Sequence, residues 1–183
     1  MAAGCRLGQL CFTSIRLTWR TGMKNIKKIM VGVDFSSYSK DTLAYAAILA
    51  EKYQAVLIVV NVINKRDMDT ILKVAEGQFD RNIEKYVEKA AEEYIKRVKV
   101  ERTRQMGELI DEVGCSGVTT HKVFRVGVPF QELISAIEEE GPDLMVMGPK
   151  GRSDLAGVLF GSNAEKVFRR CPIPLLSVRS EKQ

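Results

Sequence analysis

The chain has 183 residues, of which 45% are hydrophobic, so it is long enough to bury one core and form a single domain. Its formal net charge is +5, but Arg6, Arg16 and Arg20 lie among residues 1–22, where there is no acidic residue, and the remainder carries only about +2. This modest charge gives no support to a nucleic-acid-binding protein, and no apolar run approaches the ~18 residues of a membrane span.

Cysteine and histidine limit the chemistry that the chain can carry out. The four cysteines, Cys5, Cys11, Cys115 and Cys171, form no C-x2-C pair, so we interpret them as free thiols in a reducing compartment, which favours the cytoplasm. His121 is the only histidine, so the chain offers few residues from which a zinc site of His and Cys ligands or a Ser-His-Asp triad could be built. We expect His121 on the surface of a strand.

From residue 27 onward the apolar pattern predicts alternating strands and helices. Residues 27–33 form a first strand that is apolar on both faces, as in the centre of a parallel sheet, and a helix with a stripe of small residues follows at about 37–53. Residues 55–63 form a second buried strand. Asp34 stands where the first strand ends, where a carboxylate can contact a ligand or hold a metal through water. It could equally cap the following helix.

The middle of the chain continues this alternation. Residues 64–78 are polar and mixed, which predicts a connection with at most a short helix. From Phe79 toward Gly114 apolar residues recur at helical spacing, and the Glu and Lys residues between them are typical of a solvated face. Residues 117–126 predict a third strand, and Pro129 is at an early position of the next helix. This order of elements predicts a parallel five-stranded sheet with helices on both faces.

Residues 143–178, DLMVMGPKGRSDLAGVLFGSNAEKVFRRCPIPLLSV, contain the pattern most relevant to function. A buried strand at 144–147 leads into a loop with glycines at 148, 151 and 161, and a helix follows directly. Glycine at 148 and 151 would let the backbone adopt positive φ and approach a ligand with no Cβ in the way. The order of strand, glycine loop and helix start predicts a phosphate-binding site, although such spacing also occurs in ordinary loops.

The start of the last helix has the features of an anion site. At Gly161, Ser162 and Asn163 the free N–H groups of a helix start coincide with the positive end of its dipole. Ser162 or Asn163 could also serve simply as the N-cap. Three side chains of this helix are expected to form one apolar face: Ala164, Val167 and Phe168.

Residues 143–178 resemble the C-terminal segment of the universal stress protein family, specifically its ATP-binding branch, whose signature is G-x2-G-x9-G-[ST]. Every fixed position of the signature matches. Residues 27–50, KKIMVGVDFSSYSKDTLAYAAILA, are similar to the first strand and helix of the same family, and the resemblance covers nearly all of 26–179. It implies an adenine nucleotide alpha hydrolase-like, Rossmann-like α/β/α sandwich of strand order 3-2-1-4-5, in which Asp34 and Gly148 become neighbours.

The resemblance also divides the chain. Residues 26–180 form the universal stress protein domain, and residues 1–25 are an N-terminal extension that is either poorly ordered or the product of a misannotated start. The second alternative is suggested by Met23, which begins a sequence that looks like a normal start for the family. The Arg-rich, acid-free composition of the extension is also typical of a mitochondrial targeting segment.

A nucleotide site follows from the same resemblance, with adenine near Val62, ribose near Gly148 and the triphosphate across the later glycines. The implied nucleotide-binding residues are Gly32, Val33, Asp34, Val62, Met147, Gly148, Lys150, Gly151, Arg152, Gly161, Ser162 and Asn163. Lys150 and Arg152 could neutralise phosphate charge or simply be solvated. The implied cofactors are ATP and Mg²⁺ or Mn²⁺, with Asp34 as a metal contact through water.

Our leading hypothesis is a nucleotide-responsive regulatory module of the stress response that acts as a homodimer on an unidentified protein partner. The family pairs the last strand, Pro174–Val178, with the same strand of a second subunit, which would cover an exposed sheet edge. No obvious general base accompanies the glycine loop, so enzyme activity is expected to be at most slow ATP hydrolysis. A slow ATPase or autophosphorylating enzyme is one alternative, and a nucleotide-free dimerisation module is the other.

Overall fold

The computed structural model describes residues 25–66, 84–151 and 160–179. Several predicted features lie outside these residues: nearly all of the N-terminal extension, most of the connection at 64–78, the helix start at Phe79, and Arg152. Within the described ranges, no helix is both long enough and apolar enough to cross a membrane.

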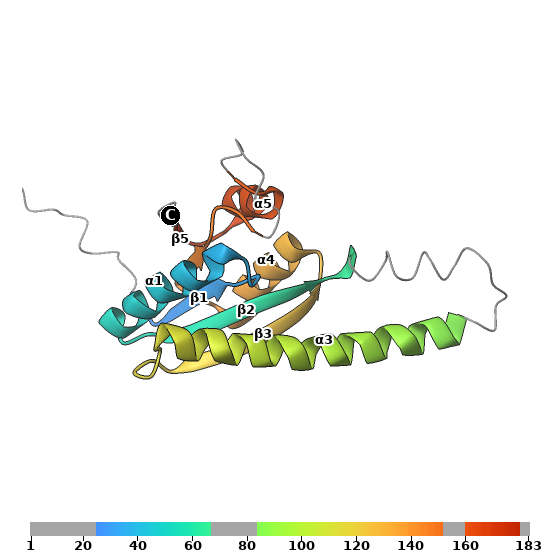
Figure 1. The fold of residues 1–183 in the computed structure, drawn as a ribbon. Coiled ribbons are helices and arrows are strands. Elements are labelled where there is room, and N and C mark those ends of the chain that lie inside the picture. Colours follow the sequence, from blue (N-terminus) through green and yellow to red (C-terminus); the bar gives the residue numbers. More distant parts are fainter. Residues whose placement is uncertain (1–24, 67–83, 152–159, 180–183) are drawn as a thin grey trace, which may run out of the picture.

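Five parallel strands form one sheet in the order β3-β2-β1-β4-β5, which confirms the predicted topology (Figure 1). The strands are β1 (Lys28–Gly32), β2 (Val56–Asn64), β3 (Thr120–Gly127), β4 (Leu144–Met147) and β5 (Leu175–Ser177). β1 lies in the centre and pairs with β2 on one side and β4 on the other. The direction in which the chain adds strands therefore reverses between β1 and β4, and such a reversal opens a crevice at the carboxyl ends of the strands.

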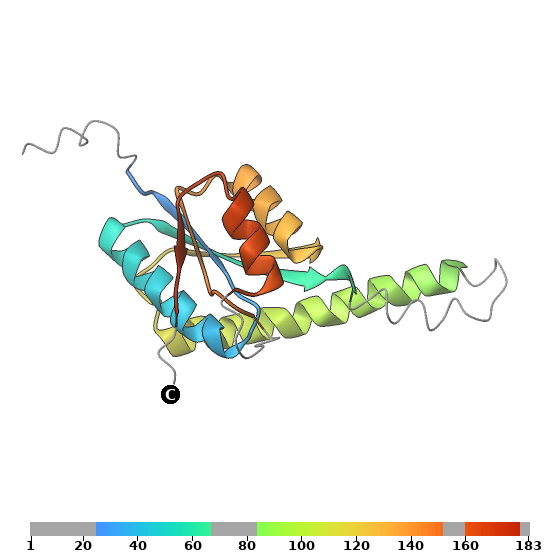
Figure 2. The ribbon, with the colours of Figure 1, turned by 90° about the horizontal axis from the view of Figure 1, so that it is seen from above.

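Helices cover both faces of the sheet. α1 (Ser37–Tyr53) and α3 (Glu84–Val113) lie on one face, and α4 (Pro129–Glu140) and α5 (Ser162–Arg170) lie on the other (Figures 1 and 2). The alternation of side chains along β1 follows from this arrangement: Ile29 and Val31 pack beneath α1 and α3, whereas Met30 packs beneath α4 and α5. All three are fully buried, as expected for a central strand between two helical layers.

The helix boundaries largely follow the sequence signals. α1 has the predicted bounds, and α4 has proline in its first turn and ends at Gly141, which has a φ of 60°. α3 is a single helix that runs beyond the carboxyl end of β2 in both views (Figures 1 and 2). Met106, on the part of α3 that covers the sheet, is fully buried.

One alternative and one expectation for α5 are not met. Its N-cap is Gly161, with no side-chain capping bond, so neither Ser162 nor Asn163 has that role. Phe168 is 60% exposed, because the buried stripe of this nine-residue helix consists of Ala164 and Val167. The ring of Phe168 instead stacks on Phe160, with 5.9 Å between the ring centroids.

Candidate functional site

A cleft of about 400 Å³ lies at the carboxyl ends of β1, β2 and β4, next to the first turns of α1, α4 and α5. This is the crevice that the reversal of strand order creates. Apart from Arg152, every residue predicted for the nucleotide site lines it: Gly32, Val33, Asp34, Val62, Met147, Gly148, Lys150, Gly151, Gly161, Ser162 and Asn163. The fold therefore brings together residues from three regions of the chain that are far apart in sequence.

Sequence reasoning missed other lining residues: Ser36, Tyr38, Ser39, Thr42, Val60, Asn64, Arg66, Pro129, Leu133 and Ala164. Most belong to the first turns of helices, or to the segment just beyond β2. Their positions after the carboxyl ends of strands were a usable signal, because those ends share one edge of a parallel sheet. Arg66 in particular is a basic residue of the cleft that a search confined to the glycine loop could not find.

Asp34 holds the start of α1 with one of its carboxylate oxygens. Its Oδ1 accepts a hydrogen bond from the Ser36 backbone N–H at 3.0 Å and another from the Ser39 hydroxyl at 3.1 Å. Ser36 is the N-cap residue of α1, but its side chain makes no capping bond. The two bonds hold Asp34 at the start of α1, but neither comes from a backbone N–H of the first helical turn, so they do not amount to the capping bond considered from the sequence. These two bonds also fix the direction of its carboxylate at the cleft.

The second oxygen of Asp34 points at the glycine loop. A Cβ built on Gly151 would lie far inside van der Waals contact of Asp34 Oδ2. At Gly148 a Cβ would lie 3.2 Å from the backbone oxygen of Lys150 and 3.3 Å from the Cβ of Tyr38. Glycine is favoured at both positions: a side chain at 151 would displace the Asp34 carboxylate, and one at 148 would crowd the backbone and the Cβ of Tyr38.

Our expectation that Gly148 and Gly151 adopt positive φ is wrong. In the part of the chain that the structure describes, the glycines with positive φ are Gly114 and Gly141, both at the ends of helices remote from the loop. Conformational freedom is therefore not what the loop glycines provide. They provide close approach between the loop, the carboxyl end of β1 and the start of α1.

The two ends of the glycine loop, at Pro149 and at Gly161, lie side by side at the cleft. The N–H of Gly161 donates to the backbone oxygen of Pro149 at 2.9 Å, so the two ends of the loop are joined directly. α5 begins at the next residue, and Ser162, Asn163 and Ala164 line the cleft. First-turn N–H groups have no partners within their own helix, so together with the helix dipole they can bind an anion.

The described lining combines charge, hydroxyl groups and an apolar wall. Its charged residues are Asp34, Arg66 and Lys150, which leaves a net positive charge that favours an anion. Ser36 Oγ is buried and has no hydrogen-bond partner among the described residues. The apolar wall consists of Val33, Val60, Val62, Pro129, Leu133 and Met147. A ligand with a flat apolar part and an anionic part would complement this surface.

Comparison with known proteins agrees with this fold and cleft. The sequence model of the universal stress protein family matches residues 25–179. The chain is 27% identical to universal stress protein MJ0577 of Methanocaldococcus jannaschii over 158 residues, which cover 84% of this chain and 94% of that protein. The solved structure of MJ0577 is similar with a TM-score of 0.69 at 22% identity, and the match covers 87% of this chain and 100% of that one.

Two further solved structures of universal stress proteins contain nucleotides. The Archaeoglobus fulgidus protein in complex with dAMP has a TM-score of 0.55 at 16% identity, and the match covers 85% of this chain and 100% of that one. A universal stress protein in complex with cAMP has a TM-score of 0.52 at 22% identity, with 85% and 98% covered. At these identities the likeness shows a common fold.

Proposed function

The chain belongs to the universal stress protein family, and from this premise we propose that it binds an adenine nucleotide, ATP with a divalent cation, in the cleft. One observation carries the proposal: the glycine loop, the first turn of α5 and the carboxylate of Asp34 surround the same cleft. Its volume of about 400 Å³ is within the usual range for small-molecule sites, roughly 300–1,000 Å³.

The apolar residues of the lining suit the base. Val33, Val62 and Met147 offer the β-branched and flexible apolar surface that packs well on a flat ring. The dAMP and cAMP complexes of other family members support an adenine nucleotide as the ligand. Among adenine nucleotides we choose ATP, because the chain carries the full G-x2-G-x9-G-[ST] signature.

The glycine loop and the first turn of α5 suit the phosphates. The first turn of α5 offers free N–H groups, and the absence of side chains at Gly148 and Gly151 lets phosphate oxygens approach the backbone. Lys150 lines the cleft here and can pair with phosphate. Arg152 stays a prediction, because it lies outside the described residues.

Asp34 is our candidate metal contact. A divalent cation bound between ATP phosphates usually keeps several waters, and a carboxylate can hold one of those waters rather than the ion itself. The bonds from Ser36 and Ser39 restrain the Asp34 carboxylate before any ligand arrives, which lowers the entropic cost of such a contact.

We further propose that residues 26–180 act as a cytoplasmic regulatory domain that dimerises through the edge of β5. Leu176, at the centre of this edge strand, is 37% exposed. Pairing with the same strand of a second copy would supply partners for the backbone N–H and C=O groups of the edge and would cover this side chain. Nucleotide occupancy would then alter the dimer surface or its protein partner.

The direct test is a calorimetric titration of the full-length chain, in the presence and absence of Mg²⁺, with ATP, ADP, AMP, adenosine and GTP. The proposal predicts saturable binding of ATP with Mg²⁺, weaker binding of adenosine, and weaker binding of GTP, because base and phosphate both contribute. Equal binding of ATP and GTP would contradict the adenine assignment. No binding of any of them would contradict the site as a whole.

A further inference from the structure

Phe35 is the one residue between Asp34 and Ser36, which both line the cleft, and its backbone is unusual. Its φ is 60°, in the left-handed region that bulky side chains rarely adopt. Such conformations persist where surrounding contacts hold them, and they concentrate at functional sites. The contacts of the Phe35 side chain therefore bear on the geometry of the cleft.

Helix α3 supplies one of those contacts. The Phe35 ring packs on the core cluster that lies beneath α1 and α3. Above the ring lies the guanidinium of Arg102, with its Cζ 5.0 Å from the ring centroid, which is the geometry of a cation–π interaction. Arg102 thus provides one contact between the long helix and the segment that carries Asp34.

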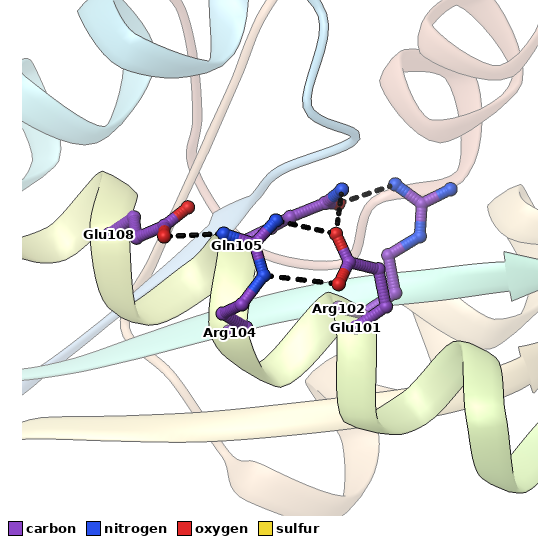
Figure 3. Close-up of polar contacts among 5 residues, drawn as sticks. All are labelled: Glu101, Arg102, Arg104, Gln105 and Glu108. Atoms are coloured by element: carbon purple, nitrogen blue, oxygen red, sulfur yellow. Dashed lines mark hydrogen bonds and ion pairs between the residues drawn. The ribbon is translucent and has the colours of Figure 1, made fainter.

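A chain of polar contacts along α3 holds the Arg102 side chain in place (Figure 3). Arg102 donates to Gln105 at 3.2 Å, and Gln105 donates to Glu101 at 2.9 Å. Glu101 also accepts from Arg104 at 2.7 Å, and Arg104 pairs with Glu108. Exposed ion pairs contribute little stability one at a time, but this connected set restricts the positions that Arg102 can adopt.

The same arginine is connected to the cleft by a second route, through a neighbouring groove. Arg102 lines a groove of about 520 Å³ between α3 and the end of β2, and Val62 and Asn64 line both this groove and the cleft. α3 is therefore adjacent to the proposed nucleotide site at two places, Phe35 and the end of β2. A change in the position of α3 would alter the contacts at both places.

We propose that Arg102 is a positioning residue of the cleft: through Phe35 it fixes the segment that orients the Asp34 carboxylate, and so it couples α3 to the binding of a nucleotide–metal complex. This inference rests on the proposed function and adds α3 to it as the responsive element. Because coupling is reciprocal, a partner that displaces α3 would weaken nucleotide–metal binding by the same factor as occupancy of the cleft weakens that partner.

The test compares Arg102→Ala, Arg102→Lys and Phe35→Leu in the full-length chain, with Lys96→Ala as the matched control. Lys96 is an exposed cation of the same helix and lines neither the groove nor the cleft. Arg102→Ala and Phe35→Leu should each weaken binding of Mg²⁺–ATP by about three- to tenfold, as expected for loss of one partly buried cation–π contact. Binding of ATP in EDTA should change less, and Arg102→Lys should recover part of the loss.

The double variant decides whether Arg102 acts through Phe35. If it does, adding Arg102→Ala to Phe35→Leu causes no further loss of affinity for Mg²⁺–ATP. If the two residues act independently, their losses of affinity are additive. Additive losses, or an Arg102→Ala protein that binds Mg²⁺–ATP like Lys96→Ala, would overturn the inference and leave the proposed function intact.

Amide hydrogen exchange tests the positioning without any nucleotide. The Ser36 N–H donates to Asp34 Oδ1, so Arg102→Ala should speed its exchange while the amides of β1 keep their protection. If the wild-type chain binds no nucleotide, the proposed function fails and the coupling fails with it. Exchange at Ser36 then still decides whether Arg102 holds this segment, and an unchanged rate would overturn that too.

Discussion

The carboxylate of Asp34 occupies the space that a side chain at position 151 would need. Asp34 ends the first strand and Gly151 lies in the glycine loop, yet a Cβ on Gly151 would overlap Oδ2 of Asp34. Two hydrogen bonds to Oδ1, from Ser36 and Ser39, keep the carboxylate from simply turning away. The position of the Asp34 carboxylate and the absence of a side chain at 151 therefore go together.

The first prediction concerns Gly151→Ala. The added methyl group displaces the Asp34 carboxylate from the position proposed for the metal contact, so affinity for Mg²⁺–ATP should fall about tenfold, a loss of roughly 1.4 kcal/mol. Calorimetric titration measures the loss. Gly117→Ala is the matched control, because a Cβ there meets nothing within 4 Å. Equal affinities of the two variants would contradict the crowding argument.

Asp34→Asn separates charge from shape. The amide oxygen can still accept the bonds from Ser36 and Ser39, but the negative charge is lost. ATP binding in EDTA should therefore be kept or strengthened, because the repulsion between the carboxylate and the phosphates disappears, whereas the gain in affinity on adding Mg²⁺ should shrink by about fivefold or more. Titrations with Mg²⁺ and with EDTA give both quantities. A full Mg²⁺ effect in the variant would exclude Asp34 as the metal contact.

Met106→Ala tests the docking of α3 on the sheet. Met106 is fully buried, so truncation should lower the free energy of unfolding by about 2–5 kcal/mol. Val100 on the same helix is 72% exposed, and Val100→Ala should change stability by less than about 0.5 kcal/mol. Urea unfolding followed by circular dichroism measures both. Similar midpoints for the two variants would contradict the packing of α3.

The predicted dimer depends on the edge of β5. In Leu176→Glu, two like charges would face each other across the pairing of identical strands, so the dimer should dissociate. Leu176 is partly exposed in the single chain, and the monomer fold should tolerate the change. Sedimentation equilibrium compares this variant with Val100→Glu, which places the same charge on a remote helix. A Leu176→Glu protein that stays dimeric would refute pairing through β5.

Burial gives the two described cysteines a predictable pH dependence. It raises the pKa of the Cys115 thiol, and it raises the pKa of the Cys171 thiol more than a backbone hydrogen bond with Ile173 lowers it. The thiolate is the reactive form, so alkylation at pH 8 should be slower than for free cysteine, whose pKa is about 8.5. Iodoacetamide labelling, mapped by mass spectrometry, measures each rate. Rapid labelling of both thiols at neutral pH would contradict their burial.

The same shifts determine how stability depends on pH. Because the folded-state pKa values lie above those of the unfolded chain, the unfolded chain loses these protons first as pH rises. The contribution of both thiols to stability is therefore present below about pH 8.5 and is lost above it.

The sequence pattern predicted the order of the elements along the chain, and the resemblance to the family predicted how the strands pair. The small residues of α1, the apolar run of β4 and the proline at the start of α4 gave boundaries within a few residues of those observed. The strand order confirmed the resemblance to the family and brought Asp34 into one cleft with Gly148. These are properties of local pattern and topology, which a sequence carries directly.

What the sequence could not supply were contacts between distant segments. The need for glycine at position 151 comes from Asp34, which lies far away in the chain, so the loop pattern alone suggested positive φ instead. Periodicity identified the apolar residues of α5 but not the width of its buried stripe, so it included Phe168. Likewise, nothing in the spacing of α3 indicates that Arg102 lies over Phe35.

The measurement that tests the central claim most directly is to purify the full-length chain, denature it, and identify any released nucleotide by chromatography and mass spectrometry. The account predicts that an adenine nucleotide is recovered, with ATP indicating slow turnover and ADP indicating hydrolysis. Protein that is empty as purified should bind added ATP with Mg²⁺. Protein that releases no nucleotide and also fails to bind ATP with Mg²⁺ would contradict the account.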